Sequence, residues 1–483
     1  MSFTPETPAD GPDPRRWMAL MVLATAQFMV VLDASIVNVA LPSIKTDLGF
    51  SETSLQWVVN AYTLAFGGFL LLGGRGADLF GRRRVFIVGL GLFAVASLAG
   101  GFATSSGWLI AARGVQGLGA AIVSPAALAI VTTTFTEGAE RNKALGIWGA
   151  LAGAGGAVGV LMGGVLTTGL GWEWVLFVNV PIAAGAALAA PRFVRESRTH
   201  ERTSLDVAGA VSVTAGLVVL VYALVDAHDA GWGSGQTLGL LALSVLLLVS
   251  FVAIELRRRH PIMPLTIFRN RKVASADAVA LLVGASLFSM FFFISLYLQQ
   301  VLGDSALEAG LSYLPLSAAI ITSAGAASQL VTRVGPKPVL VSGLALTTIG
   351  LLLFTQISAG GSFAGDVLLP SVIVAVGLGL SFVSLTITAV AGVSHQEAGM
   401  ASGLLNTAQQ VGGALGLAVL SSVAAARIAD VGGGGSPAAL TEGFQSAFAV
   451  GAGFAFLGVV LALVVVPHVK PEAIDAQEAP VAA

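Results

Sequence analysis

The stretch Leu32 to Leu41, LDASIVNVAL, places an aspartate inside an apolar segment that is long enough to span a membrane. From Trp17 to Ala40 the only charged residue is Asp33. At about 1.5 Å per residue, a helix of this length crosses a hydrocarbon core roughly 30 Å thick. An ionised carboxylate at that depth costs at least about 2.5 kcal/mol, so its presence predicts a partner of opposite charge or a role in binding protons.

The composition of the whole chain is that of a membrane protein with many spans. Of its 483 residues, 55% are hydrophobic and 10% are charged, and the mean hydropathy is +0.88. A soluble protein carries about a quarter charged residues. We therefore predict an all-α polytopic membrane protein.

The same composition excludes several kinds of site. The chain has no cysteine, so it has no disulfides, thiolate metal sites or thiol nucleophiles. No phosphate-binding loop of the G-x-x-x-x-G-K-[ST] type occurs, and the five histidines are not spaced as metal ligands. The net charge of -2, with basic residues confined to particular loops, gives no indication of nucleic-acid binding. We expect no cofactor, no bound metal and no enzymatic activity.

Apolar runs of spanning length are separated by glycine, proline or charged residues. The pattern predicts fourteen membrane-spanning helices, at 17–40, 54–73, 85–103, 107–131, 143–168, 172–190, 205–225, 236–256, 275–302, 307–331, 338–358, 366–392, 400–426 and 443–467.

Basic residues indicate how these spans are oriented, because loops on the cytoplasmic side of a membrane carry an excess of Lys and Arg. With fourteen spans and the N-terminus inside, all but three of the 24 basic residues fall on the inner side. The exceptions are Lys45 and Arg427 on the outer side and Arg113 within a span. We therefore expect a protein of the bacterial cytoplasmic membrane with both termini in the cytoplasm.

Two basic inner loops, 191–204 and 257–273, bracket a helix pair with few polar residues in its spans. We interpret the pair as a hairpin inserted between two six-helix bundles, because paired halves with a substrate site between them are a common transporter plan. The predicted segments are a disordered tail 1–16, an N-terminal bundle 17–200, a linker hairpin 201–262, a C-terminal bundle 263–468 and a tail 469–483.

Asp33 has one candidate partner in the spans. Arg113 lies five residues into the fourth span from its outer end, which is a depth similar to that of Asp33. Opposite charges at matched depth offset each other's burial. We predict that Asp33 and Arg113 couple protons to the movement of a substrate; the alternative is a static ion pair that holds the two helices together.

The segment from Gly74 to Val85, GRGADLFGRRRV, is predicted to form a short inner loop. Gly81 permits a tight turn, Asp78 is placed to pair with or cap a neighbouring helix, and the arginines after Gly81 suit the anionic inner surface of the membrane. We predict that Gly74, Asp78, Gly81, Arg82 and Arg83 form a gate latch. The alternative, that the basic residues only set topology, is preferred for Arg84.

The fifth span carries glycines at a spacing of four, among them Gly155, Gly159 and Gly163. Glycines at this spacing let a neighbouring helix backbone approach closely. The stripe predicts a helix contact, which serves either ordinary packing or a seam along which helices slide.

Seven segments in order resemble the fourteen-helix drug:proton antiporter family of the major facilitator superfamily, over nearly the whole chain. They are Asp33–Pro42, Gly74–Arg83, Arg113–Gly119 (RGVQGLG), Gly149–Gly164, Trp172–Pro181 (WEWVLFVNVP), Tyr297–Gly303 (YLQQVLG) and Ala401–Gly413 (ASGLLNTAQQVGG).

The resemblance implies the major facilitator fold and the export of amphipathic, often cationic or aromatic compounds in exchange for protons. This sequence departs from the family pattern at three positions. Leu79 replaces a basic residue of the inner-loop motif, and Glu173 replaces an arginine between two tryptophans. Val160 stands where the antiporter motif of the fifth span has a proline, which removes an expected kink.

Aromatic and amide side chains in the spans suit adaptable binding of mixed ligands. The candidate substrate-binding residues are Asn60, Gln116, Phe292, Tyr297, Asn406 and Gln410. For the phenylalanines, packing against lipid or other helices is the common alternative. Gln116 is favoured because it shares a helix face with Arg113.

We therefore expect a proton-coupled, alternating-access exporter of amphipathic small molecules that works as a monomer in the lipid bilayer. One alternative is an exporter specific for a single endogenous metabolite or lipid. Another is a membrane receptor or scaffold that transports nothing, although the chain has no sizeable soluble domain.

Overall fold

The computed structural model describes residues 15–135, 139–197, 206–258, 261–391, 393, 395–432 and 435–467. Within these ranges all regular secondary structure is helical, which confirms the all-α prediction. The predicted C-terminal tail 469–483, most of the predicted N-terminal tail 1–16 and part of the loop 191–204 lie outside the described residues.

The N-terminal half contributes six spans. Its helices are α1 (Arg16–Leu48), α2 (Glu52–Leu55), α3 (Trp57–Phe80), α4 (Arg82–Gly101), α5 (Ser106–Thr134), α6 (Ala139–Gly169), α7 (Trp174–Phe177) and α8 (Asn179–Phe193).

Two helices, α9 (Val207–Ala230) and α10 (Gly235–Arg257), form the hairpin between the halves. The C-terminal half follows. Its helices are η1 (Leu265–Arg269), α11 (Arg271–Leu296), η2 (Tyr297–Val301), α12 (Ala306–Ser312), α13 (Leu314–Val334), α14 (Pro336–Phe354), η3 (Phe363–Val367), α15 (Leu368–Val390), α16 (His395–Asp430) and α17 (Pro437–Val464).

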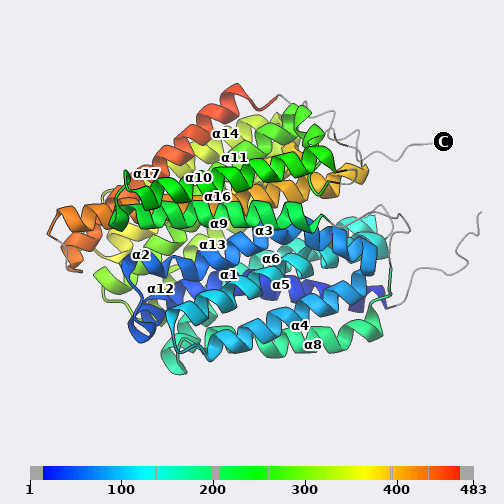
Figure 1. The fold of residues 1–483 in the computed structure, drawn as a ribbon, viewed down its shortest axis with the longest axis horizontal. Coiled ribbons are helices and arrows are strands. Elements are labelled where there is room, and N and C mark those ends of the chain that lie inside the picture. Colours follow the sequence, from blue (N-terminus) through cyan, green and yellow to red (C-terminus); the bar gives the residue numbers. More distant parts are fainter. Residues whose placement is uncertain are drawn as a thin grey trace, which may run out of the picture.

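Thirteen helices in the described part of the chain are long and apolar enough to cross a membrane. The remaining predicted span corresponds to α6, which is continuous over 31 residues and contains the apolar stretch Ala154–Gly169. Figure 1 shows the helices running roughly along one long axis, with α4, α5 and α8 on one side and α11, α14 and α17 on the other. The predicted fold class, two six-helix bundles with an inserted helix pair, is confirmed.

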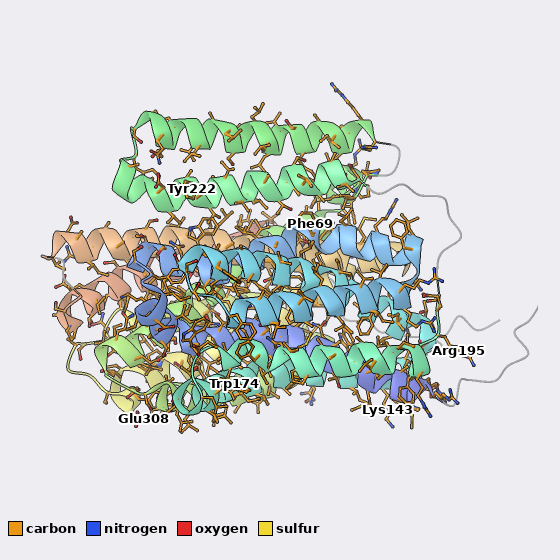
Figure 2. All side chains as sticks on the ribbon, turned by 60° about the horizontal axis from the view of Figure 1, so that its bottom comes forward. Phe69, Lys143, Trp174, Arg195, Tyr222 and Glu308 are labelled. Carbon is orange, nitrogen blue, oxygen red and sulfur yellow. The ribbon has the colours of Figure 1, made fainter. Side chains whose placement is uncertain are left out.

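The two ends of the bundle differ in charge. Figure 2 shows Lys143 and Arg195 at one end and Trp174 and Glu308 at the other. The first also contains the turn between α3 and α4, where the Arg82 N–H donates to the Ser197 carbonyl at 2.9 Å. We call it the basic end and the other the opposite end.

The segment from Gly74 to Val85 is a tight turn between two helices, so the predicted inner loop was wrong in extent. Gly74 and Asp78 belong to α3, and the helix breaks only at Gly81, which has a φ of +101°. Gly73 and Gly74 serve helix packing, because a Cβ at Gly73 would meet the carbonyl oxygen of Ala121 on α5 and one at Gly74 would lie 3.4 Å from Pro125. Close packing thus outweighs the low helix propensity of glycine.

The glycine stripe of α6 packs directly on α1, the helix that carries Asp33. A Cβ at Gly155 would lie 2.7 Å from the Phe28 carbonyl oxygen, and one at Gly163 would lie 2.7 Å from that of Ile36. Between them, a Cβ at Gly159 would lie 2.7 Å from the carbonyl oxygen of Leu32, the residue before Asp33. The stripe therefore helps to fix the backbone of α1 around Asp33.

We expect Gly159→Val to force α1 and α6 apart and to lower the free energy of unfolding by about 1–3 kcal/mol, the usual cost of overpacking. The adjacent Gly156→Val is the matched control, because no heavy atom lies within 4 Å of a Cβ at Gly156. Thermal unfolding of the purified variants measures the difference. Equal midpoints for the two variants would contradict this role of the stripe.

The inserted hairpin lies along the seam between the halves. Leu217 and Val221 of α9 pack with Leu64 of α3 and Ala414 of α16. The hydroxyl of Ser422 on α16 donates to the Leu224 carbonyl at 3.0 Å. Hairpin α9–α10 thus contacts both halves on one side of the bundle.

The halves also meet near the opposite end. Ser295 of α11 donates to the Asn38 carbonyl of α1 at 2.6 Å, and Gln299 donates to the Val39 carbonyl at 3.0 Å. On the other flank, Gly310 of α12 packs against the carbonyl of Val160 on α6. The contacts close this region of the interface in the present conformation.

Candidate functional site

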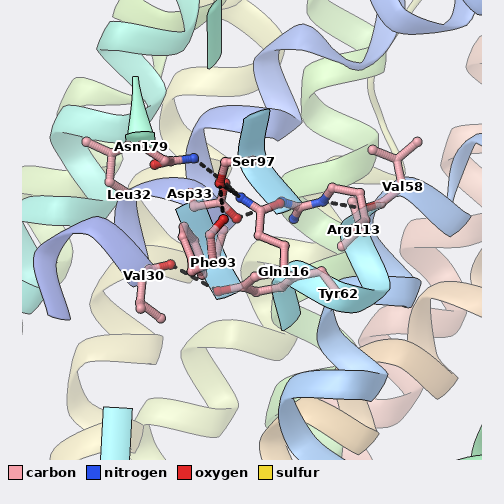
Figure 3. Close-up of polar contacts among 12 residues, drawn as sticks. Val30, Leu32, Asp33, Val58, Tyr62, Phe93, Ser97, Arg113, Gln116 and Asn179 are labelled. Atoms are coloured by element: carbon pink, nitrogen blue, oxygen red, sulfur yellow. Dashed lines mark hydrogen bonds and ion pairs between the residues drawn. The ribbon is translucent and has the colours of Figure 1, made fainter. Parts of the chain in front are cut away.

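Asp33 is fully buried, with an exposed fraction of 0%, and its carboxylate accepts three hydrogen bonds. Arg113 Nη1 donates to Oδ2 at 2.6 Å, Gln116 Nε2 donates to Oδ1 at 2.6 Å, and Asn179 Nδ2 donates to Oδ1 at 2.7 Å. The three donors come from α5 and α8, so the site joins three helices of the N-terminal half (Figure 3). Both carboxyl oxygens of Asp33 thus act as hydrogen-bond acceptors.

Arg113 is held as firmly as its partner. It is 2% exposed, its Nε donates to the Val58 carbonyl at 3.0 Å, and its Nη1 also donates to Gln116 Oε1 at 2.6 Å. The guanidinium carbon lies 4.4 Å from the centroid of the Tyr62 ring, a cation–π distance. Asp33 and Arg113 are thus a buried ion pair with well-formed secondary contacts.

Such a pair is stable only while both charges are present. Desolvation of each ion is costly, and the attraction and hydrogen bonds of the pair offset it. Loss of one charge leaves the other buried without a counter-charge, which costs about 3–5 kcal/mol. Protonation of Asp33 would therefore strain the packing of α1 against α5.

A cavity of about 610 Å³ lies between the halves. It extends toward the basic end, where Asp78 and Thr132 line it, and is bounded across the interface by Asn406 and Gln410 of α16. Its volume falls within the usual range of small-molecule sites, roughly 300–1,000 Å³.

The cavity and the ion pair share a wall. Val30 and Ala34, close to Asp33 in sequence, line the cavity, as does Tyr62. The Tyr62 hydroxyl donates to the Val30 carbonyl at 3.3 Å while its ring covers the Arg113 guanidinium. Tyr62 therefore contacts the charge pair on one side and the cavity on the other.

The lining mixes aromatic, aliphatic and amide groups. Phe66 and Trp148 supply aromatic surface, and Met400 adds a flexible apolar chain. On the polar side, Ser124 donates to Gln27 at 2.9 Å. The surface is suited to amphipathic small molecules.

The residues of the predicted gate latch lie at the basic end. Arg82 Nη2 contacts Asp78 Oδ1 at 2.7 Å, and Asp78 also lines the cavity. Glu196, after α8, accepts from the Arg83 N–H at 3.0 Å and from the Arg84 N–H at 3.2 Å. In this conformation these contacts remain within the N-terminal half.

The predicted substrate-binding residues are spread over the molecule. Gln116 belongs to the Asp33 network, while Asn406 and Gln410 line the cavity, as does Gly74 of the predicted latch. Three others are buried and are not among the lining residues: Asn60, which donates to Gln56 at 3.3 Å, Phe292, and Tyr297, which donates to the Ser358 carbonyl at 2.8 Å.

Several members of the site were not predicted from the sequence. Asn179 had a usable signal, because it is an amide inside the apolar run WEWVLFVNVP. Ser97 accepts from Gln116 Nε2 at 2.8 Å. Neither Ser97 nor Tyr62 had a usable signal in the sequence, because hydroxyl groups are common in membrane helices. Glu196 follows a basic loop segment where any single acid looks like a solvated residue.

Comparison with known proteins places the chain in a family. The model of the Major Facilitator Superfamily matches residues 23–417. The puromycin resistance protein pur8 of Streptomyces alboniger is 44% identical over 458 residues, covering 93% of this chain and 90% of that protein. The cephamycin export protein CmcT of Amycolatopsis lactamdurans is 42% identical over 457 residues, covering 93% and 92%.

Solved structures share the fold. The POT family transporter PepTSo superposes with a TM-score of 0.69 at 16% identity, covering 94% of this chain and 98% of that one. A bacterial homolog of the human lysosomal transporter Spinster gives 0.66 at 18% identity, covering 98% and 100%. With the family match over most of its length, the chain belongs to the major facilitator superfamily and is a membrane transporter rather than an enzyme.

Proposed function

We propose that this protein is a proton-coupled antiporter that exports amphipathic drugs or antibiotics by alternating access. The observation that carries the proposal is the buried Asp33–Arg113 pair beside a cavity of drug size. An acid inside a membrane span is costly, and in transporters such residues commonly bind the coupling ion. Two relatives are named for puromycin resistance and cephamycin export, which supports export of such compounds.

The proposed cycle uses the present conformation as the proton-released state. Asp33 is ionised and paired with Arg113, and the cavity is free to admit substrate from the basic end. In the other conformation a proton from outside would neutralise Asp33 and break the pair. Substrate and proton drive the exchange only by binding the two conformations with different affinities.

The membrane orientation follows from charge. We place the basic end, and with it both chain termini, in the cytoplasm of a bacterial cell, because cytoplasmic loops carry the excess of Lys and Arg. The cavity then faces inward, toward the cytoplasm and the inner leaflet. One chain supplies both the cavity and the Asp33 network, which supports function as a monomer.

A second candidate is an exporter of one compound. It is favoured by the names of relatives, which specify puromycin, cephamycin and tetracenomycin C one by one. A transport panel of dyes and antibiotics of several classes separates the two candidates. Transport of only one class would favour the narrow exporter, and membership of a transporter family argues against a receptor that moves nothing.

We expect proteoliposomes containing the purified protein to accumulate an amphipathic cation such as ethidium when the lumen is made acidic, with the basic end of the protein facing the bath. Accumulation should collapse when an ionophore removes the pH gradient. Equal ethidium accumulation with and without the pH gradient, at equal protein content, would contradict proton coupling.

A further inference from the structure

Asp277 is a second acid within a span, and it has no partner among the described residues. It lies in α11, seven residues into the helix from the basic end, and is 8% exposed. Neither carboxyl oxygen has a hydrogen-bond partner. This contrasts with Asp33, whose oxygens accept three hydrogen bonds.

The contacts of α11 place Asp277 on the face that packs against α16. Val273 clusters with Ala401 and Leu404, and Gly284 packs against the backbone of Gln409. Residues 273, 277 and 284 share one side of a helix. Asp277 therefore lies on the side of α11 that packs against α16, between the contacts to Leu404 and to Gln409.

The charged groups described on the neighbouring elements lie away from this point. Lys272 and Arg271 stand at the start of α11, with Arg269 before them on η1. On α16 the described charges, Arg427 and Asp430, lie at the opposite end, as does Glu442 on α17. On α1, Asp33 is already paired with Arg113.

An ionised carboxylate in such surroundings is strongly disfavoured, because neither a counter-charge nor a hydrogen-bond donor offsets its desolvation. The neutral acid avoids that cost. Both oxygens are inaccessible, and Asp277 is not among the residues that line the cavity between the halves, so substrate in that cavity does not contact its carboxyl group. A proton is the ligand that fits.

We propose that Asp277 is a second proton-binding site, located in the C-terminal half, which holds its proton in this conformation until bound substrate shifts α16 relative to α11, and then releases it at the basic end, near which it lies. The helix α16 links the site to transport. One of its faces packs on α11 near Asp277, while Ser402, Asn406 and Gln410 line the cavity. A rearrangement of the cavity thus changes the surroundings of Asp277.

The inference rests on the proposed antiport function and deepens it. Each half would then carry one acid: Asp33 is ionised and Asp277 is protonated in the same conformation. Both acids would take their protons from the outer side and release them at the basic end, Asp33 before substrate binds and Asp277 after, so the exchange would involve two protons for each substrate.

The first test measures protonation without transport. Infrared spectra of the purified full-length protein, recorded as the pH is raised, report the C=O stretch of protonated carboxyl groups. We expect such a band at neutral pH in the wild type and in Asp430→Asn, whose exposed side chain lies at the opposite end. Asp277→Asn, nearly isosteric with the neutral acid, should lack it, and Asp277→Glu should restore a shifted band.

The second test counts protons in proteoliposomes, as protons exchanged per ethidium. Asp277→Asn should lower the ratio by one relative to wild type and to Asp430→Asn. A spectrum of Asp277→Asn identical to wild type would overturn the proposal, as would a lost band with an unchanged ratio, which would indicate a structural proton. A selective loss of affinity for cationic substrates with no change in the ratio would instead assign Asp277 to substrate binding and would also overturn it.

Failure of the antiport proposal would look different. The wild type would then exchange no protons for substrate. The infrared band of Asp277 does not depend on transport, so its presence or absence would still test the protonation of Asp277.

Discussion

Asp33→Asn is expected to reduce transport driven by a pH gradient to the level of empty liposomes. Asparagine keeps the size of the side chain and one oxygen to accept from Gln116 or Asn179 but cannot bind and release a proton. Affinity for substrate should change by no more than about tenfold, since Asp33 does not line the cavity. The measurement is ethidium accumulation with and without the gradient.

The control for this variant is Asp430→Asn, which removes an exposed acid at the opposite end and should transport like the wild type. Equal expression and monodispersity of the two variants exclude a folding defect as the cause. Undiminished gradient-driven accumulation by Asp33→Asn would show that the coupling proton binds elsewhere.

The second large effect concerns stability. Arg113→Ala leaves the Asp33 carboxylate buried without its counter-charge and opens a space under Tyr62. The expected loss is about 3–5 kcal/mol in free energy of unfolding, which appears as a lower midpoint of thermal unfolding.

A double variant separates the structural role of the pair from its role in coupling. Asp33→Asn with Arg113→Gln removes both charges and keeps amides in place, so its midpoint should rise above that of Arg113→Ala and above that of Asp33→Asn. Its proton-linked transport should remain absent. A midpoint of thermal unfolding as low as that of the single variants would mean that charge balance does not stabilise this region. Proton-linked transport by the double variant would mean that the pair has a structural role only.

The Asp33–Arg113 pair was predictable because two charges at the same depth of an apolar helix have few ways to be satisfied. Depth along each helix follows from counting residues, and the fold then brought the side chains to 2.6 Å. Asn179 and Ser97 were not predicted, because their approach depends on which faces of α8 and α4 turn inward. A single sequence does not fix the rotation of a helix that is apolar on all sides.

The turn near Gly81 shows a second limit of prediction from sequence, which concerns where a helix ends. Glycine and arginine near Gly74 suggested a loop, yet α3 continues to Phe80 because its glycines fit against α5. In membrane helices, glycine also marks places where two helices pack closely. Loop signals taken from soluble proteins therefore ended the span too early.

Cavity residues were the hardest to predict. Asn406 and Gln410 line the cavity, whereas Phe292 and Tyr297 pack inside the C-terminal half in this conformation. Aromatic residues are equally useful in a core and in a binding site, so their type carries little information about which one they serve. Their part in binding remains a prediction for other conformations of the cycle.

The central claim is that substrate favours the conformation in which Asp33 is ionised, so that adding substrate draws molecules out of the protonated conformation and releases the proton of Asp33. The most direct measurement is the pH change of a weakly buffered solution of purified protein on addition of ethidium, followed with a pH-sensitive dye. The wild type should release protons in proportion to the amount of protein, and Asp33→Asn should lack the part of this release that comes from residue 33. Equal release from wild type and Asp33→Asn across the pH range would contradict the account.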